Sequence, residues 1–105
     1  MTDYPPHFIM LTKTAAADTP FKLIGNDLWL EYADIFITTN SAYLGNITEQ
    51  NAAIYANDVY SILTPVNVFD LFFKNYTGGS NCVVTIIGVT LTRSKAKEYN
   101  VTLPP

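Results

Sequence analysis

The stretch that decides the fold is VNVFDLFFK at Val66–Lys74, followed by CVVTIIGVTLT at Cys82–Thr92. Both runs are predicted to be β-strands, and residues 78–80 (GGS) between them favour a tight turn. Successive side chains of a strand point to opposite sides of the sheet, and in both runs the two sides are apolar. We therefore predict a hairpin with two apolar faces, only one of which can pack on the core of so small a domain.

Strand alternation divides the side chains of both runs between the core and a partner. Because a slip of one residue exchanges the two faces, the core is predicted as a set of residues and not side chain by side chain. The predicted core residues are Phe69, Leu71, Phe73, Ile35, Ile37, Val84 and Ile86. The residues predicted to face a partner are Val68, Phe72, Val83, Ile87, Val89 and Leu91.

The rest of the chain has the pattern of short strands separated by turns. Apolar residues alternate over 28–33 and again over 34–40, and no long segment has helical periodicity. Further short strands are expected at 8–12, 21–24, 42–44, 52–55 and 59–63. We predict an all-β, single-domain antiparallel β-sandwich or jelly-roll-like barrel over residues 13–92, with extended terminal arms at residues 1–12 and 93–105.

Both arms are expected to serve as interface segments. Pro5 and Pro6 fix φ and oppose helix formation. The basic residues Arg93, Lys95 and Lys97 are spaced by two, so they share one side of an extended segment. A helix over SKAKEY would be too short to stand alone in water. We therefore expect the arms to be disordered in the isolated chain and ordered against a neighbour, with a merely solvated tail as the alternative.

Composition limits the function classes. The chain has 105 residues, which make one domain, and 14% of them are charged, against roughly 25% in an average soluble domain. Low charge leaves neutral surface, as a covered interface needs. With only six Lys and Arg and a net charge of −3, nucleic acid is excluded as a partner. No apolar run approaches the roughly 18 residues of a membrane-spanning helix, and no signal-peptide pattern is found.

No constellation of residues points to catalysis. The single histidine, His7, follows two prolines on an arm that does not hold it within reach of a substrate. The lone Cys82 is expected to be a buried apolar residue. Asp27, Glu31 and Asp58 lack the spacing that gathers calcium ligands. We therefore expect no enzyme, with no catalytic residue, no cofactor and no metal site.

From Asp34 onward the segments follow in the order DIFITTNSAYLGN, NAAIYANDVYSI, NVFDLFFKN, TGGSN and CVVTIIGV. These Thr- and Asn-rich strands, glycine turns and closing apolar run resemble small β-sandwich structural proteins of tailed-phage virions, of the capsid decoration (cement) or head-fibre type. The resemblance covers residues 10–92 and consists of strand and turn patterns, so no binding residue is carried over. It implies a virion protein made in the host cytoplasm.

Two functions remain open. The first is a non-enzymatic virion structural protein that docks on and stabilises a viral capsid. Its partners would be the major capsid protein or other virion proteins and itself, as a homo-oligomer with a trimer favoured. The alternative is a carbohydrate- or receptor-binding module of a phage fibre, although the spacing of the aromatic candidates does not place them on one face. Those candidates are Tyr43, Tyr55, Tyr60, Tyr76 and Trp29.

Overall fold

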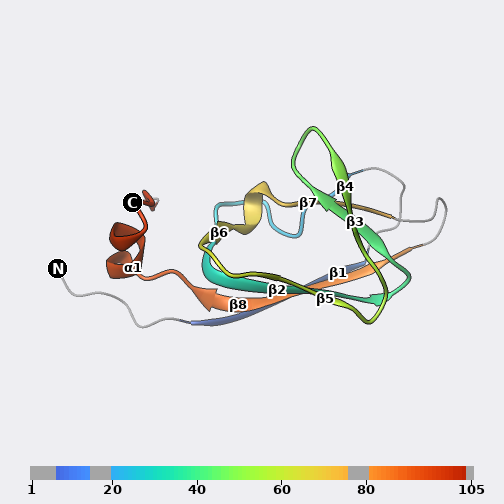
Figure 1. Cartoon of the computed structure of the whole chain (residues 1–105), viewed down its shortest axis with the longest axis horizontal. Helices are drawn as coiled ribbons and strands as arrows, with labels where there is room; N and C mark the ends of the chain where they lie inside the picture. Colours follow the sequence, from blue (N-terminus) through green and yellow to red (C-terminus); the bar gives the residue numbers. More distant parts are fainter. Residues whose placement is uncertain (1–6, 15–19, 76–80, 104–105) are drawn as a thin grey trace.

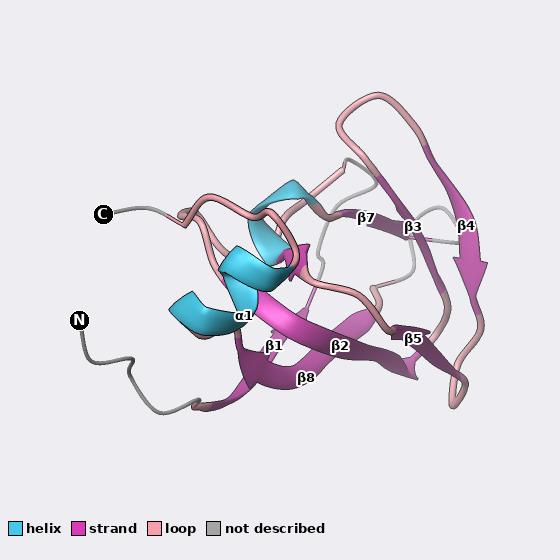
Figure 2. Ribbon diagram, turned by 60° about the vertical axis from the view of Figure 1, so that its left-hand side comes forward, coloured by secondary structure: helices cyan, strands magenta, loops and turns pink. Residues whose placement is uncertain are grey.

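The computed structural model describes residues 7–14, 20–75 and 81–103, and it has the expected all-β sandwich architecture. Two antiparallel sheets lie across from each other (Figure 1, Figure 2). The larger sheet has the strand order β1-β8-β2-β5, with β6 also paired to β2, and the smaller has the order β4-β3-β7. The elements are β1 Phe8–Thr14, β2 Trp29–Thr39, β3 Ala42–Gly45, β4 Gln50–Ile54, β5 Val59–Ile62, β6 Val66–Asn67, the 3₁₀ helix η1 Val68–Asp70, β7 Phe72–Asn75, β8 Val83–Thr90 and α1 Arg93–Glu98.

The core lies between the two sheets and is built mainly from alternate residues of β2 and β8, which meet side chains of β3, β4 and β7. The predicted core residues that are fully buried are Ile35, Ile37, Phe73, Val84 and Ile86. Phe69 and Leu71 are only partly buried. Leu71, just after η1, packs against the core cluster as predicted. The core prediction is wrong for Phe69, which lies in η1 and does not belong to the cluster.

Strand β2 runs without a break through two segments that the sequence pattern separates. Leu30 and Tyr32 pair with consecutive residues of β8, so Glu31 is an extra residue that forms a β-bulge. The bulge shifts the alternation by one position. As a result Leu30 and Ala33 both reach the core, while Tyr32 lies on the opposite side of the sheet.

The predicted hairpin is wrong, because Val66–Lys74 is not one strand. The run is divided into β6, η1 and β7. Asn67 is the N-cap of η1, and its side-chain oxygen accepts a hydrogen bond from the backbone N–H of Phe69 at 3.1 Å. The chain thereby crosses from the larger sheet to the smaller one. β7 pairs with β3, whereas β8 pairs with β1 and β2; the turn expected at 78–80 lies outside the described residues.

The strand expected at 21–24 is replaced by an irregular segment that joins the smaller sheet through a bridge between Phe21 and Phe73. The backbone groups of these two residues exchange hydrogen bonds of 2.8 and 2.9 Å. Their rings pack with centroids 5.9 Å apart. This segment therefore extends the smaller sheet beside β7.

The N-terminal boundary differs from the expected arm. The short strand predicted at 8–12 is present and longer, as β1, and all seven of its residues pair with β8. Residues 8–12 therefore belong to the sheet and not to a free arm. Residues 1–6 lie outside the described part of the chain.

The C-terminal segment is helical where an extended arm was expected. The Oγ1 of Thr92 accepts a hydrogen bond from the backbone N–H of Lys95 at 3.2 Å, which caps the start of α1. Asn100 follows the helix with a φ of 59°, and the N–H of Val101 bonds back to the carbonyl oxygen of Ala96 at 2.8 Å. This is the pattern of a Schellman cap. Capping at both ends stabilises a helix too short to form alone.

Candidate functional site

The larger sheet has one side toward the core and one side that points away from the smaller sheet, here called the outer face. Its side chains are the alternate residues of β1, β8, β2 and β5 that do not enter the core, and the strand register places them side by side. The outer face consists of Phe8, Met10, Thr12, Val83, Thr85, Ile87, Val89, Tyr32, Asp34, Phe36, Val59 and Ser61.

The apolar side chains of the outer face are neighbours across the strands. Met10 lies directly opposite Ile87, and Val89 lies between Phe8 and Tyr32. Phe8 is 69% exposed and Met10 is 63% exposed. Removing such surface from water is worth about 25 cal/mol per Å². A partner that covers this face therefore gains binding free energy without any change in the fold.

The polar side chains of the outer face bond to one another. The hydroxyl oxygens of Thr12 and Thr85 are 3.0 Å apart, and the Ser61 hydroxyl donates a hydrogen bond to the Asp34 carboxylate at 2.7 Å. Unpaired polar groups are what makes covering a surface costly. Because these groups already have partners within the face, an apolar partner can cover them at a smaller cost.

The structure separates the apolar residues predicted to face a partner. Val83, Ile87 and Val89 lie on the outer face, where the predicted alternation of β8 places them. Val68 is fully buried in the core, because η1 turns it inward, and Leu91 is also buried after the end of β8. The interface prediction is wrong for Val68 and Leu91.

The predicted basic cluster is spread around α1 and not along one side of an extended segment. With 3.6 residues per turn, Arg93 and Lys97 share a side of the helix and Lys95 points elsewhere. Lys95 forms an ion pair with Glu98 at 3.7 Å. This pair is exposed, so it contributes little to stability.

Sequence reasoning missed several residues of the outer face. Phe8 and Met10 belong to the run FIML, in which all four residues are apolar. A strand with two apolar faces could therefore have been recognised there, as it was in β8. Phe36 joins the face through its pairing with Thr85 of β8, and Val59 joins it through the register between β2 and β5. That register depends on the loop lengths and the bulge, for which the sequence carries no clear signal.

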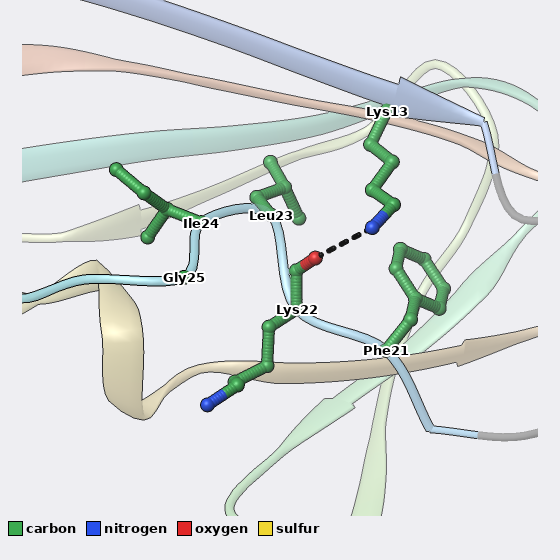
Figure 3. Close-up of a pocket in the computed structure, with 6 residues that line it drawn as sticks. All are labelled: Lys13, Phe21, Lys22, Leu23, Ile24 and Gly25. Atoms are coloured by element: carbon green, nitrogen blue, oxygen red, sulfur yellow. Dashed lines mark hydrogen bonds between the residues drawn. The ribbon is translucent and has the colours of Figure 1, made fainter.

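A shallow pocket of about 370 Å³ lies between the end of β1 and residues 21–25. Lys13 Nζ donates a hydrogen bond to the carbonyl oxygen of Lys22 at 3.1 Å, and the Lys22 side chain points away from this contact (Figure 3). The lining is mostly apolar, with Phe21, Leu23 and Ile24, and it also includes Lys13 and Lys22. It contains no carboxylate, histidine, hydroxyl or thiol side chain.

A second pocket, of about 320 Å³, is lined by Phe69, Phe72 and the loop after β3. Lys22 Nζ lies 3.5 Å from the ring centroid of Phe69 and 5.3 Å from that of Phe72. This is cation–π geometry. The interface candidate Phe72 belongs to β7 of the smaller sheet and lies away from the outer face.

The residues considered from the sequence for catalysis or metal binding do not lie together in one site. His7 is exposed just before β1, and Cys82 is fully buried. Burial raises the pKa of the Cys82 thiol, which disfavours the thiolate that a nucleophile needs. Asp27 accepts a hydrogen bond from the Asn67 amide at 3.0 Å. Within the described ranges, no three His, Cys, Asp or Glu residues are placed to hold a metal ion.

Of the aromatic candidates for a sugar platform, Trp29 and Tyr43 are partly buried, Tyr55 and Tyr60 are exposed near the turn between β4 and β5, and Tyr76 lies outside the described residues.

No helix in the described part of the chain is long and apolar enough to cross a membrane. Comparison of the chain with protein-family models, curated proteins and solved structures finds no match. The functional proposal therefore rests on the outer face.

Proposed function

We propose that this chain is a non-enzymatic structural subunit that docks through its outer face onto a larger protein assembly. The observation that carries the proposal is the row of apolar side chains across β1, β8 and β2, with Phe8 and Met10 at its exposed end. Contiguous exposed apolar surface is typical of interaction sites. The resemblance to phage decoration proteins favours a viral capsid as the assembly and its major capsid protein as the partner.

The charges of the outer face favour a protein partner. Asp34 is the one carboxylate on the face and it accepts a hydrogen bond from Ser61. The face has no Lys or Arg, and the whole chain has a net charge of −3. Phosphate-rich partners such as nucleic acid require a basic surface, so an apolar protein surface is the partner class that this face favours.

Docking stabilises the assembly by mass action and requires no chemistry. A subunit that binds the assembled lattice and not its separate parts stabilises the lattice by RT ln(1 + [L]/Kd), which is about 2.7 kcal/mol per site at a hundredfold excess over Kd. If the subunit is itself an oligomer, several outer faces engage together. Linked sites bind more tightly than one site alone.

The test is co-sedimentation of the purified chain with capsid shells of the phage whose genome encodes it. Wild type is expected to pellet with the shells, and Met10→Lys, which places a charge on the outer face, is expected to pellet at least tenfold less. The matched control is Ile47→Lys, because Ile47 is 77% exposed in the loop after β3, away from the outer face. This control is expected to bind as wild type does.

Two outcomes would contradict the proposal. The first is equal pelleting of wild type, Met10→Lys and Ile47→Lys, which would mean that the outer face is not the docking surface. The second is no pelleting with shells together with saturable binding of wild type on a glycan array. That result would support the alternative, a carbohydrate-binding module of a fibre.

A further inference from the structure

Among the described residues, one edge of the larger sheet is β1, and the other is formed by β5 and, further along β2, by the two residues of β6. On β5 the three consecutive residues Val59, Tyr60 and Ser61 are all exposed, although their side chains alternate between the two faces. On β1, Phe8 and Met10 are exposed as well. An edge strand with apolar side chains and unpaired backbone groups is a template for pairing with another chain.

The two edges carry opposite charges at the same end of the sheet. Lys13, near the end of β1, pairs with Val84, and Val84 pairs with Ile37 on β2. Phe36, which precedes Ile37 on β2, pairs with Val59. Asp58 precedes Val59, so it lies on the other edge at the level of Ile37 and Lys13. Lys13 Nζ donates to a backbone carbonyl, but an ammonium has three donors, so it can also bond to a carboxylate.

An exposed apolar residue of the β1 edge also lies at the same level along the strands as one of the β5 edge. Phe8 lies at the level of Tyr32, and Tyr32 precedes Ala33, which pairs with Ile62. Leu63 therefore lies at the level of Phe8. Leu63 is 82% exposed, so a copy of the chain placed beside β5 in the same register would bring its Phe8 against this Leu63.

We propose that the β5 edge of one copy pairs with the β1 edge of the next copy, in an antiparallel and head-to-tail manner, so that the larger sheet continues from copy to copy in a closed ring. Successive strands of the sheet are antiparallel, and a second copy in the same orientation presents β1 antiparallel to β5. The inference rests on the proposed function, because it names the second copy of this chain as one partner of the docking subunit.

Charge favours this pairing over a two-fold one. Strand β1 contains a lysine and no acidic residue, and β5 contains no charged residue and follows Asp58. Pairing β1 with β1 gives Lys13 no carboxylate, and pairing β5 with β5 gives Asp58 no cation. Head-to-tail pairing supplies both, and a closed ring leaves neither edge open.

Disulfide trapping tests the pairing directly. One chain carries Phe8→Cys and the other carries Leu63→Cys and is labelled with ¹⁵N, so that mass spectrometry distinguishes the products. Within one copy the two edges are three strand spacings apart, about 14 Å, whereas a disulfide requires Cα atoms within about 7 Å. Intrachain closure is thus excluded, and the native Cys82 is buried.

Under mild oxidation at tens of micromolar, the mixture is expected to form mixed dimers at least tenfold faster than either variant forms dimers alone. A mixture of Leu63→Cys with Ile47→Cys, whose cysteine is exposed away from both edges, gives the collisional background. The pair Thr12→Cys with Val59→Cys repeats the test four residues along the matched register. The double variant Phe8→Cys/Leu63→Cys is expected to give one closed covalent species.

Several results would overturn the inference. Dimers of Leu63→Cys alone or of Phe8→Cys alone would mean two-fold pairing of like edges. Cross-linking of both matched pairs at the background rate would mean that the edges do not pair, and an unlimited covalent ladder would exclude a closed ring. Co-sedimentation of the wild-type chain with capsid shells is measured separately, so the docking proposal stands or fails independently of the edge pairing.

Discussion

The Oδ1 atom of Asn67 accepts a hydrogen bond from the backbone N–H of Leu28 at 3.0 Å. The same oxygen accepts the N–H of Phe69, and the Asn67 side chain is buried. Asn67→Ala leaves both backbone groups without this acceptor, so we expect the free energy of unfolding to fall by about 1–3 kcal/mol. Urea denaturation measures the change. Asn51→Ala, at an exposed position of β4, is the control, and an equal effect of both substitutions would contradict this role of Asn67.

Two phenylalanines of the same run are expected to differ in their contribution to stability. Phe73 is fully buried between the sheets, whereas Phe69 is partly exposed beside Lys22. Phe73→Ala should lower the free energy of unfolding by about 3–5 kcal/mol, and Phe69→Ala by only about 1 kcal/mol. Equal losses in urea denaturation would show that η1 is not formed and that the run is one strand.

Gly88 is required by the β-bulge of β2. A Cβ atom at Gly88 would lie 2.3 Å from the carbonyl oxygen of Tyr32 and 2.9 Å from Leu30 Cδ1. The backbone oxygen cannot move without breaking the sheet, so Gly88→Ala is expected to lower the free energy of unfolding by about 1–3 kcal/mol. At Gly25 an added Cβ meets no atom within 4 Å, and Gly25→Ala should leave stability nearly unchanged. A harmless Gly88→Ala would mean that β2 and β8 do not approach so closely.

Cys82 is expected to make stability depend on pH in the alkaline range. Burial raises the pKa of its thiol in the folded chain, so the unfolded chain loses the proton first, from about pH 8.5. The thiol's contribution is present below that pH and is lost as pH rises through the folded pKa. Relative to Cys82→Ala, wild type should therefore lose stability as the pH rises above about 8.5. A constant difference between the two denaturation curves would contradict the burial of the thiol.

Strand β8 and the fold class could be predicted from the sequence because their signals are local. The apolar run of β8 is uninterrupted, and turn residues separate the short strands on either side. The break at Val66–Lys74 could not be predicted in this way, since it depends on the bond of Asn67 to Leu28, 39 positions away. The composition of that run alone favours a strand.

The helix α1 is a different case, because its signals were present and were outweighed by its short length. Thr92 is a favourable N-cap residue and Asn100 is a favourable residue for the left-handed position after a helix. Both serve these roles in the structure. For the outer face, the alternation of β8 correctly predicted Val83, Ile87 and Val89. Phe8 and Met10 could be placed there only after β1 was found to pair with β8.

The most direct test of the central claim is hydroxyl-radical footprinting of the chain, free and bound to capsid shells, with oxidation of Met10 as the readout. Met10 is 63% exposed on the outer face, and Ile47 in the loop after β3 serves as the internal control. The account predicts that Met10 oxidation falls at least fivefold on binding while Ile47 oxidation stays within twofold of its free value. Unchanged oxidation of Met10 in the bound chain would contradict docking through the outer face.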